Sequence, residues 1–358
     1  MNLLSVYQDV EKNLQKLDFS LLHPGFHKYR FALYTQEQVC LDGELLPYDE
    51  RFLANTAICL DGEYIAIWDM GCGEESALDT ELLTYQIVHE MFHCFQFENG
   101  ETRFPNDLKL LNAPADFGYY TGKYLENQYL AEAFSQETGN GESMKKGAEA
   151  LQQFSALRNS RFSRYGEYML EELKAETAEG AAEFVGLKAL KFINPAKYHA
   201  IIKDYLGKLR NDLPLLFDTR RLSYYTGALF CLAIERFQPP LKNAFGELPI
   251  FLQNPLQTAL SETMPWQPVQ NCEALSREFH KLREKQERMI SDHRKNNHYT
   301  ACPAVICGYD PMNMFRTGNL LYCSHFLFLQ SDTGTIRLDG PILAVLKDGT
   351  ANEVLGYY

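Results

Sequence analysis

The chain has 358 residues, of which 34 are Lys or Arg and 47 are Asp or Glu, and its formal net charge is −13. This acidic balance argues against a nucleic-acid-binding protein, because clustered Lys and Arg side chains hold the phosphate backbone. A hydrophobic content of 46% beside 23% charged residues is typical of a globular protein with a sizeable core, and it excludes general disorder. No apolar run approaches the roughly 20 residues of a membrane-spanning helix, so we expect no membrane partner.

Residues 1–17 are predicted to form an amphipathic helix, because apolar residues recur at helical spacing from Leu3 to Leu17. This stretch contains Asp9 and has neither a basic start nor a long apolar run, which argues against a signal peptide. The nine cysteines form no CxxC pair. Without an export signal, this usage predicts buried, reduced thiols in a cytoplasmic protein.

Residues 29–68 are predicted to form an antiparallel β-sheet built from two hairpins. The pentapeptide Cys-Leu-Asp-Gly-Glu occurs at 40–44 and again at 59–63. Asp-Gly between apolar runs is typical of a tight hairpin turn, because Asp and Gly tolerate the positive φ that the turn needs. The second hairpin should end in a strand at 64–68.

Residues 79–98 form the clearest predicted helix, which Asp79 or Thr80 can cap and which Asn99-Gly100 ends. Its apolar residues lie on most sides, so we expect the helix to be buried. The Pro- and Gly-containing stretch 100–122 is predicted to be a loop. Further helices are predicted at about 123–138, 143–158, 162–190, 195–209, 220–237 and 272–295.

The composition becomes β-rich after Asn296-Asn297. Strands are predicted at 301–307, 320–330, 342–346 and 353–357, with Asp-Gly turns at 339–340 and 348–349. We therefore predict an α+β fold of two parts. The first is a body of residues 1–297, β-rich at 29–68 and helical at 79–295, and the second is a small antiparallel β module of residues 298–358.

The predicted buried helix contains the sequence His89-Glu90-Met91-Phe92-His93. Because His89 and His93 are four residues apart, they lie on one helix face, where two imidazoles can bind one zinc ion. Glu90 is rotated off that line and can act as a general base on a water molecule. The alternative is a structural helix with a coincidental motif. The apolar surroundings argue against it, because buried His and Glu side chains without partners are costly.

A catalytic zinc usually has three protein ligands. No histidine lies between Cys94 and Gly100, so we expect a carboxylate from another helix. The segment 168–192 has four glutamates on one face: Glu172, Glu176, Glu179 and Glu183. The small residues that follow Glu179 would let this helix pack close to another backbone, as a short carboxylate ligand requires. Glu176 is the alternative ligand.

These motifs resemble those of the gluzincin group of zinc metallopeptidases, whose HExxH motif is completed by a Glu on a later helix. The chain looks most like members with a Glu-Gly-x-Ala-x-aromatic motif, here Glu179-Gly180-Ala181-Ala182-Glu183-Phe184. The resemblance runs from the second hairpin to Leu190. It implies a zincin-like fold in which His89, His93 and Glu179 are zinc ligands and Glu90 is the base.

The same resemblance implies that the strand at 64–68 is an edge strand along which an extended peptide aligns. It also implies that Glu183 orients a ligand histidine, as second-shell carboxylates commonly do. The spacing between His93 and Glu179 is longer than in thermolysin-like enzymes, so extra helices must be inserted between them.

Peptide hydrolysis also benefits from a donor that stabilises the oxyanion. Tyr224 and Tyr225, at the start of a later apolar helix, are the candidates, with aromatic packing as the alternative for each. Together these features predict a cytoplasmic zinc metallopeptidase that acts on a peptide or protein substrate. The alternative is a zinc-binding protein on the same scaffold that has a binding or regulatory role and no catalytic activity.

Overall fold

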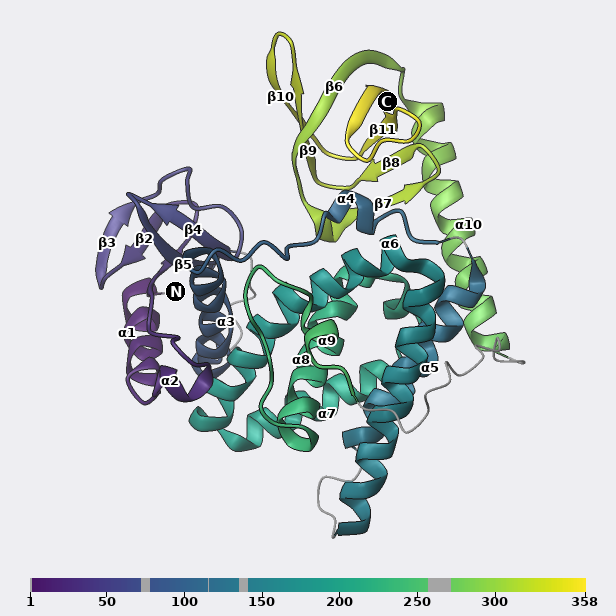
Figure 1. Ribbon diagram of the computed structural model, residues 1–358. Coiled ribbons are helices and arrows are strands. Elements are labelled where there is room, and N and C mark those ends of the chain that lie inside the picture. The colour runs from purple at the N-terminus through teal and green to yellow at the C-terminus, as the bar shows by residue number, and fades with distance from the viewer. Residues whose placement is uncertain (1, 72–77, 115, 135–140, 257–271) are drawn as a thin grey trace. The chain divides into compact units, whose positions relative to one another are not determined.

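The computed structural model describes residues 2–71, 78–114, 116–134, 141–256 and 272–358, and these form an α+β fold (Figure 1). The chain divides into two compact units. The first consists of Met1–Phe104, Ala175–Lys208 and Tyr224–Pro255, and the second of Pro105–Lys174, Leu209–Ser223 and Leu256–Tyr358. The division into residues 1–297 and 298–358 stays a prediction.

The first unit contains a five-stranded sheet in the order β3-β2-β1-β5-β4. Its strands are β1 (Arg30–Tyr34), β2 (Gln38–Leu41), β3 (Glu44–Pro47), β4 (Thr56–Leu60) and β5 (Glu63–Asp69). Both predicted hairpins are confirmed, because Asp42-Gly43 joins β2 to β3 and Asp61-Gly62 joins β4 to β5. All four turn residues have positive φ, as the turn chemistry requires.

Two predictions about this sheet are wrong. The sheet is mixed and not antiparallel throughout, because β1 and β5 run parallel, with Ala32 opposite Ile67. The strand at 64–68 is not an edge strand either, since β5 lies between β1 and β4, and β4 forms the edge on that side. The turn signals specify each hairpin locally but do not determine which strand of the second hairpin pairs with β1.

Helices α1 (Leu3–Leu14) and α3 (Thr80–Glu98) both contact this sheet, and the short α2 (Phe19–Leu22) follows α1 (Figure 1). The carboxylate of Asp79 caps α3 by accepting hydrogen bonds from the backbone N–H groups of Glu81 and Leu82. Every residue of α3 from Ile87 to Gln96 is buried. The prediction of a capped, buried helix at 79–98 is therefore confirmed.

The remaining helices differ from the predicted ones mainly at their ends. The stretch expected to be a loop contains α4 (Asp107–Leu110) and the start of α5 (Phe117–Phe134), and residues 135–138 of the predicted helix lie outside the described residues. The two helices predicted at 143–158 and 162–190 are both contained in α6 (Gly141–Ile193), and non-helical backbone angles at Tyr165 form a kink between its two parts. The predicted break is therefore present, a few residues later than expected. The other helices are α7 (Pro195–Asn211), η1 (Pro214–Phe217), α8 (Thr219–Phe237), α9 (Ile250–Gln253), α10 (Glu273–Asn296) and η2 (Pro311–Asn313).

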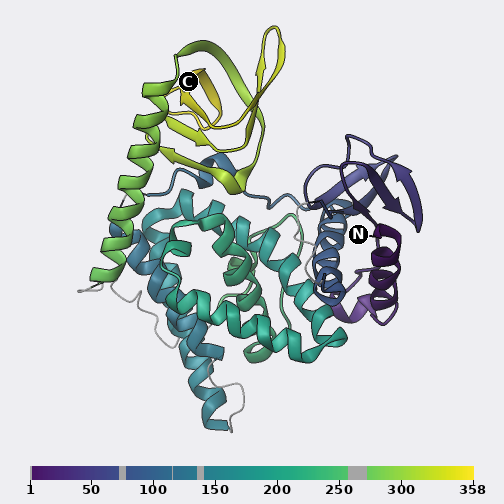
Figure 2. The same cartoon turned by 180° about the vertical axis from the view of Figure 1, so that it is seen from behind.

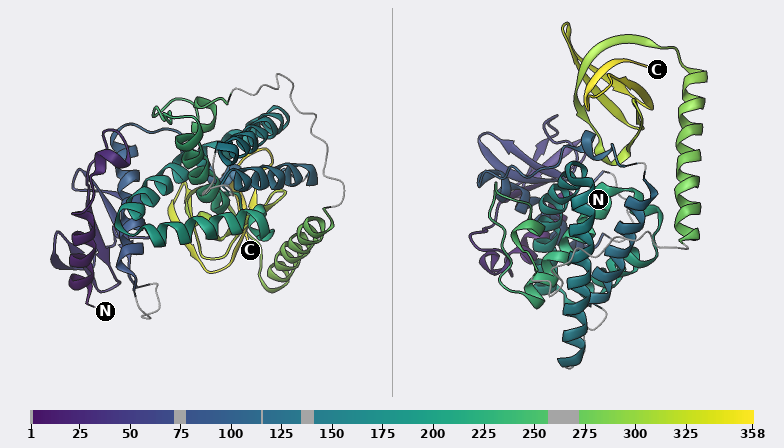
Figure 3. Two further views of the ribbon diagram at one scale, coloured as in Figure 1. Left: turned by 90° about the horizontal axis from the view of Figure 1, so that it is seen from below. Right: turned by 45° about the vertical axis from the view of Figure 1, so that its right-hand side comes forward.

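The second unit contains a seven-stranded sheet in the order β10-β9-β6-β12-β11-β8-β7, and all its neighbouring strands are antiparallel, as predicted. The strands are β6 (Thr300–Tyr309), β7 (Met314–Thr317), β8 (Leu320–Cys323), β9 (Phe326–Ser331), β10 (Gly334–Asp339), β11 (Ile342–Leu346) and β12 (Glu353–Tyr357). The single strand predicted at 320–330 is two strands, because the chain bends at Ser324-His325. Helix α10 runs beside this sheet, where Ile290 packs with Tyr322 and Leu343 (Figures 2 and 3).

A cluster of buried charges joins α5 to α6 within the second unit. Arg161 bridges the carboxylates of Glu126 and Glu172, with a nitrogen 2.7 Å from an oxygen of each. These three side chains are at most 1% exposed. Glu172 shares a predicted helix face with Glu179, but its carboxylate forms a buried ion pair with Arg161.

The eight described cysteines are free thiols. Four of them are buried, namely Cys40, Cys94, Cys231 and Cys323, whereas Cys59 and Cys307 are exposed. The prediction of buried thiols is therefore correct for half of the described cysteines. Within the described part of the chain, no helix combines the length and the apolar character needed to cross a membrane.

Candidate metal centre

Two helical segments of the first unit, α3 and the part of α6 from Ala175 on, bring together the side chains of His89, His93 and Glu179. The histidines lie on α3 and the glutamate on α6, and each residue is at most 8% exposed. The Nε2 atoms of the two histidines are 3.2 Å apart. Oε2 of Glu179 lies 3.6 Å from Nε2 of His89 and 3.3 Å from Nε2 of His93. Among the described residues, no other three His, Cys, Asp or Glu side chains converge in this way.

The separations between these three atoms fit the coordination sphere of a small tetrahedral ion. Zinc binds nitrogen and carboxylate oxygen at about 2.0–2.2 Å, which places neighbouring tetrahedral ligands about 3.3–3.6 Å apart. The observed values, 3.2, 3.3 and 3.6 Å, agree with this spacing. The three residues can therefore hold a metal ion with little rearrangement.

The Nδ1 atom of each histidine, which faces away from the other two side chains, has a hydrogen-bond acceptor. Nδ1 of His89 lies 3.0 Å from Oε2 of Glu183, and Nδ1 of His93 lies 2.7 Å from Oε1 of Gln96. With Nδ1 donating in each ring, both Nε2 atoms present lone pairs toward each other and toward the Glu179 carboxylate. Three acceptors that face one point need a cation between them.

In the metal-free protein, a proton on His89 takes the place of that cation. Burial alone would lower the pKa of His89, but hydrogen bonding to Glu179 and Glu183 outweighs burial and raises this pKa to about 10. The His89 imidazole therefore carries a proton at neutral pH in the metal-free protein. A metal ion that binds here must displace that proton.

Gln96 belongs to this group of side chains, although the sequence alone did not predict it. Its side chain is fully buried, and its Nε2 donates a hydrogen bond of 3.1 Å to the carbonyl oxygen of Ala178, the residue before Glu179. Gln96 thereby connects one candidate ligand, His93, to the helix that carries another, Glu179. Its position three residues after His93, on the same side of the helix, is the signal that could have identified it.

Glu183 lies against the candidate ligand His89, the position that the resemblance implied for it. It also accepts a hydrogen bond from the hydroxyl of Tyr205 on α7. Burial and the nearby Glu183 carboxylate raise the pKa of Tyr205 well above its usual value, so its hydroxyl stays protonated and donates. No sequence pattern marks Tyr205, because its helix approaches α6 only in the folded chain.

Glu90 is buried next to this group, with 7% of its surface exposed. Among the described residues, its carboxylate has no hydrogen-bond or ion-pair partner. Burial raises the pKa of Glu90, and the neighbouring His89 and His93 only partly oppose this shift. A buried carboxyl group without a partner, beside a metal-binding group, can accept and return a proton.

Glu176, the alternative third ligand, lies elsewhere. Its carboxylate accepts a hydrogen bond of 2.6 Å from the hydroxyl of Thr226 on α8. It is also absent from the group formed by His89, His93 and Glu179. Of the two glutamates, the structure brings Glu179 to the histidines.

The small residues after Glu179 allow α6 to pack closely against another helix, as expected. At Gly180 that neighbouring helix is α8. A Cβ atom on Gly180 would lie 2.4 Å from Cα of Gly227. Helix α3 is approached six residues later, where a Cβ on Gly186 would lie 2.8 Å from the carbonyl oxygen of Tyr85. Two glycine contacts therefore fix α6 and hold Glu179 at its place.

The two candidate tyrosines have different surroundings. The ring of Tyr224 lies parallel to the His89 imidazole, with centroids 5.6 Å apart. The ring of Tyr225 packs edge-on against Tyr205 at 4.5 Å, and Nζ of Lys208 lies 4.8 Å from its centroid. Tyr224 is thus adjacent to the candidate ligand His89, whereas Tyr225 packs against Tyr205, which donates to Glu183.

No protein-family model, curated protein or solved structure matches this chain. The resemblance to the gluzincins therefore rests on the residues described above.

Proposed function

We propose that this chain is a zinc-dependent metallopeptidase of the gluzincin type with a zincin-like fold. The observation that supports this best is the convergence of two imidazole Nε2 atoms and one carboxylate oxygen beside the unpartnered Glu90. Two nitrogen ligands and one carboxylate are a common ligand set of catalytic zinc. In this proposal His89, His93 and Glu179 hold the ion.

Zinc bound at these ligands would supply Lewis acidity, which polarises the scissile carbonyl and lowers the pKa of a water molecule. Glu90 would accept the proton of the attacking water and deliver it to the leaving nitrogen. The raised pKa of Glu90 suits this role, because the group must hold a proton between the two transfers. Glu183 and Gln96 keep both imidazoles in the ligating tautomer.

Tyr224 is the stronger candidate for an oxyanion donor, because its ring lies against a ligand histidine. Tyr225 would act through Tyr205 and Glu183 and not on the substrate. For the peptide itself we infer that β4, the edge strand next to β5, replaces the strand at 64–68 as the alignment edge. Extended peptides commonly add to the free edge of a sheet in this way.

A peptide-library digest tests the proposal. The zinc-loaded protein should cleave peptides, and a chelator should abolish cleavage until zinc is restored. The Glu90→Gln variant should retain zinc and lose turnover by about 10²-fold or more, because it keeps the side-chain shape and removes the base. Glu98→Gln, an exposed position on the same helix, is the matched control and should cleave normally.

The second candidate is a zinc-binding protein with a binding or regulatory role. Intact zinc loading without any chelator-sensitive cleavage of the library would favour that function. The presence of Glu90 without a partner argues for catalysis, because a purely structural metal site has no need of a buried base. A cytoplasmic location stays part of the proposal.

A further inference from the structure

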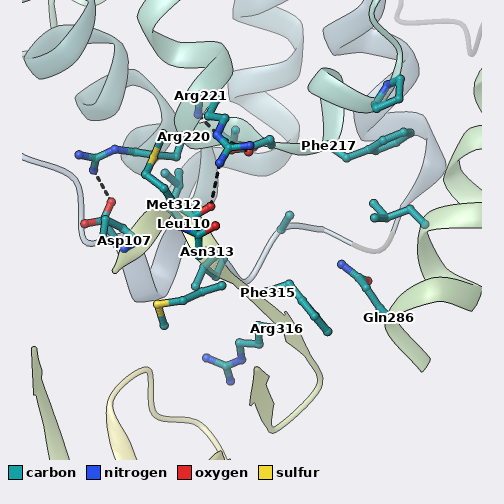
Figure 4. Close-up of a pocket in the computed structure, with 18 of the residues that line it drawn as sticks. Asp107, Leu110, Phe217, Arg220, Arg221, Gln286, Met312, Asn313, Phe315 and Arg316 are labelled. Atoms are coloured by element: carbon teal, nitrogen blue, oxygen red, sulfur yellow. Dashed lines mark hydrogen bonds and ion pairs between the residues drawn. The ribbon is translucent and has the colours of Figure 1, made fainter. Parts of the chain in front are cut away.

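A cavity of about 490 Å³ lies wholly within the second unit. Its walls come from α4, the start of α5 and the segment between them, from Tyr168 of α6, from η1 and the start of α8, from one side of α10, and from η2 and β7. Figure 4 shows Phe217 of η1, Gln286 of α10 and Phe315 of β7 around it. This volume is within the range of small-molecule sites, which commonly occupy 300–1,000 Å³.

One wall of the cavity is aromatic. Tyr120, Phe217 and Phe279 contact one another, with ring centroids 5.0, 5.4 and 5.8 Å apart. Leu282 extends this wall along α10, and Met312 of η2 and Met314 of β7 add flexible apolar surface to the cavity. Such a wall favours a ligand with an aromatic or branched aliphatic body.

The charged residues of the cavity are mainly basic. Of the seven charged lining residues, Arg220, Arg221, Arg283, Lys285 and Arg316 are basic, and Asp107 and Asp218 are acidic. Both acids already have arginine partners. Arg220 pairs with Asp107 (Figure 4), and Nε of Arg221 lies 3.5 Å from a carboxylate oxygen of Asp218. The cavity is therefore cationic in a chain whose formal net charge is −13.

Arg283 is the basic residue best placed to hold an anion. It is half-buried in the cavity wall, and its charge acts on the phenol of Tyr120. Among the described residues it has no ion-pair or hydrogen-bond partner. A partly desolvated guanidinium group favours a carboxylate, sulfonate or phosphate, which its planar donors can bind in a bidentate manner.

We propose that this cavity binds a small organic anion, with its acidic group on Arg283 and its apolar body against Tyr120, Phe217 and Phe279. The shared chemistry is a carboxylate, sulfonate or phosphate on an aromatic or branched aliphatic skeleton. This site uses none of the residues of the metal centre. The proposal therefore stands or fails independently of the peptidase function.

Isothermal titration calorimetry of the full chain with three probes tests the proposal. The probes are 2-naphthoate, its uncharged analogue 2-naphthamide, and inorganic phosphate. The naphthoate should bind with one-to-one stoichiometry and at least about 10-fold more tightly than either other probe, because only it uses both the arginine and the aromatic wall. Absence of naphthoate binding at millimolar concentration would overturn the proposal. Equal binding of the amide would overturn it too, because Arg283 would then contribute nothing. Equal binding of phosphate would also overturn it, because the aromatic wall would then contribute nothing.

Two variants localise the binding. Arg283→Gln should weaken naphthoate binding by about 10- to 100-fold, whereas Arg288→Gln, an exposed arginine on the same helix outside the cavity, should leave it unchanged. Ala113→Phe should block binding by filling the cavity. Circular dichroism and thermal unfolding verify that each variant is folded. Unchanged affinity in a folded Arg283→Gln variant would contradict the assignment.

Discussion

Nδ1 of His93 donates to Oε1 of Gln96, and the amide nitrogen of Gln96 donates to the helix residue that precedes Glu179. One buried side chain thus links two of the three candidate ligands, although they are far apart in the sequence. A change at Gln96 should therefore alter both the orientation of an imidazole and the position of a carboxylate.

Gln96→Leu keeps the size of the side chain and removes both hydrogen bonds. We expect zinc affinity to fall by about 10- to 100-fold, the usual effect of losing an outer-shell partner. Competition with a chromophoric chelator measures this. Gln86→Leu, at a half-buried position on the same helix, is the control. Equal affinities in the two variants would show that Gln96 has no orienting role.

Gly180→Ala tests the close contact between α6 and α8. The new Cβ would lie 2.4 Å from Cα of Gly227, so the helices must separate, at an expected cost of about 1–3 kcal/mol in the free energy of unfolding. Zinc affinity should fall as well, because Glu179 is the adjacent residue. Gly207→Ala on α7 meets nothing within 4 Å and should be neutral or slightly stabilising. Urea unfolding measures the free energy of unfolding of both variants. An unchanged value for Gly180→Ala would argue against the close contact between α6 and α8.

Glu172→Gln tests the buried charges of the second unit. Losing this partner of Arg161 should cost about 3–5 kcal/mol of stability, whereas Glu149→Gln, in an exposed pair on the same helix, should change stability little. Urea unfolding at pH 7 measures both. Similar effects in the two variants would contradict a structural role for the buried pair.

The same carboxylate should make stability depend on pH. Burial alone would raise the pKa of Glu172, but Arg161 and Lys123 outweigh burial and hold this pKa well below its usual value. Because the folded-state pKa is lowered, the stabilisation is present above the unfolded-state pKa and is lost as the pH falls below it. Unfolding curves between pH 7 and pH 3 should show a smaller acid sensitivity in Glu172→Gln than in the unmodified chain.

Zinc binding should release about one proton per ion between pH 7 and 8. With a pKa raised to about 10, His89 is protonated in the metal-free protein and must lose that proton to ligate. The proton's stabilisation of the metal-free fold is complete below the unfolded-state pKa and is lost as the pH rises through about 10. Calorimetry in buffers of different ionisation enthalpy counts the protons. No release would mean that the histidines are already neutral.

The sequence correctly predicted those features that depend on neighbouring residues alone. The cap at Asp79 and the two Asp-Gly turns depend on residues adjacent in the chain, and the structure has all three as expected. The parallel pairing of β1 with β5 depends on contacts between distant segments, which no turn signal encodes. The break between the helices predicted at 143–158 and 162–190 is present as a kink, but it lies at Tyr165, a few residues after the predicted position.

The candidate site shows the same limit. Helical spacing was enough to place His89 and His93 on one face, and the glycine after Glu179 did mark a close helix contact. The partner of that contact, Gly227, and the support that Tyr205 gives to Glu183 arise from helices that meet only in the folded chain. Hydrogen-bond partners of this kind are fixed by tertiary structure, so the sequence alone could not reveal them.

The zinc content of three purified proteins, measured by mass spectrometry after reconstitution and removal of excess metal, tests the central claim most directly. We predict about one zinc per chain in the unmodified protein and little zinc in Glu179→Gln. Glu176→Gln should also bind about one zinc, because the Glu176 carboxylate accepts a hydrogen bond from Thr226 and does not belong to the metal group. A zinc-free unmodified protein, or zinc retained in Glu179→Gln and lost in Glu176→Gln, would contradict the metal centre described here.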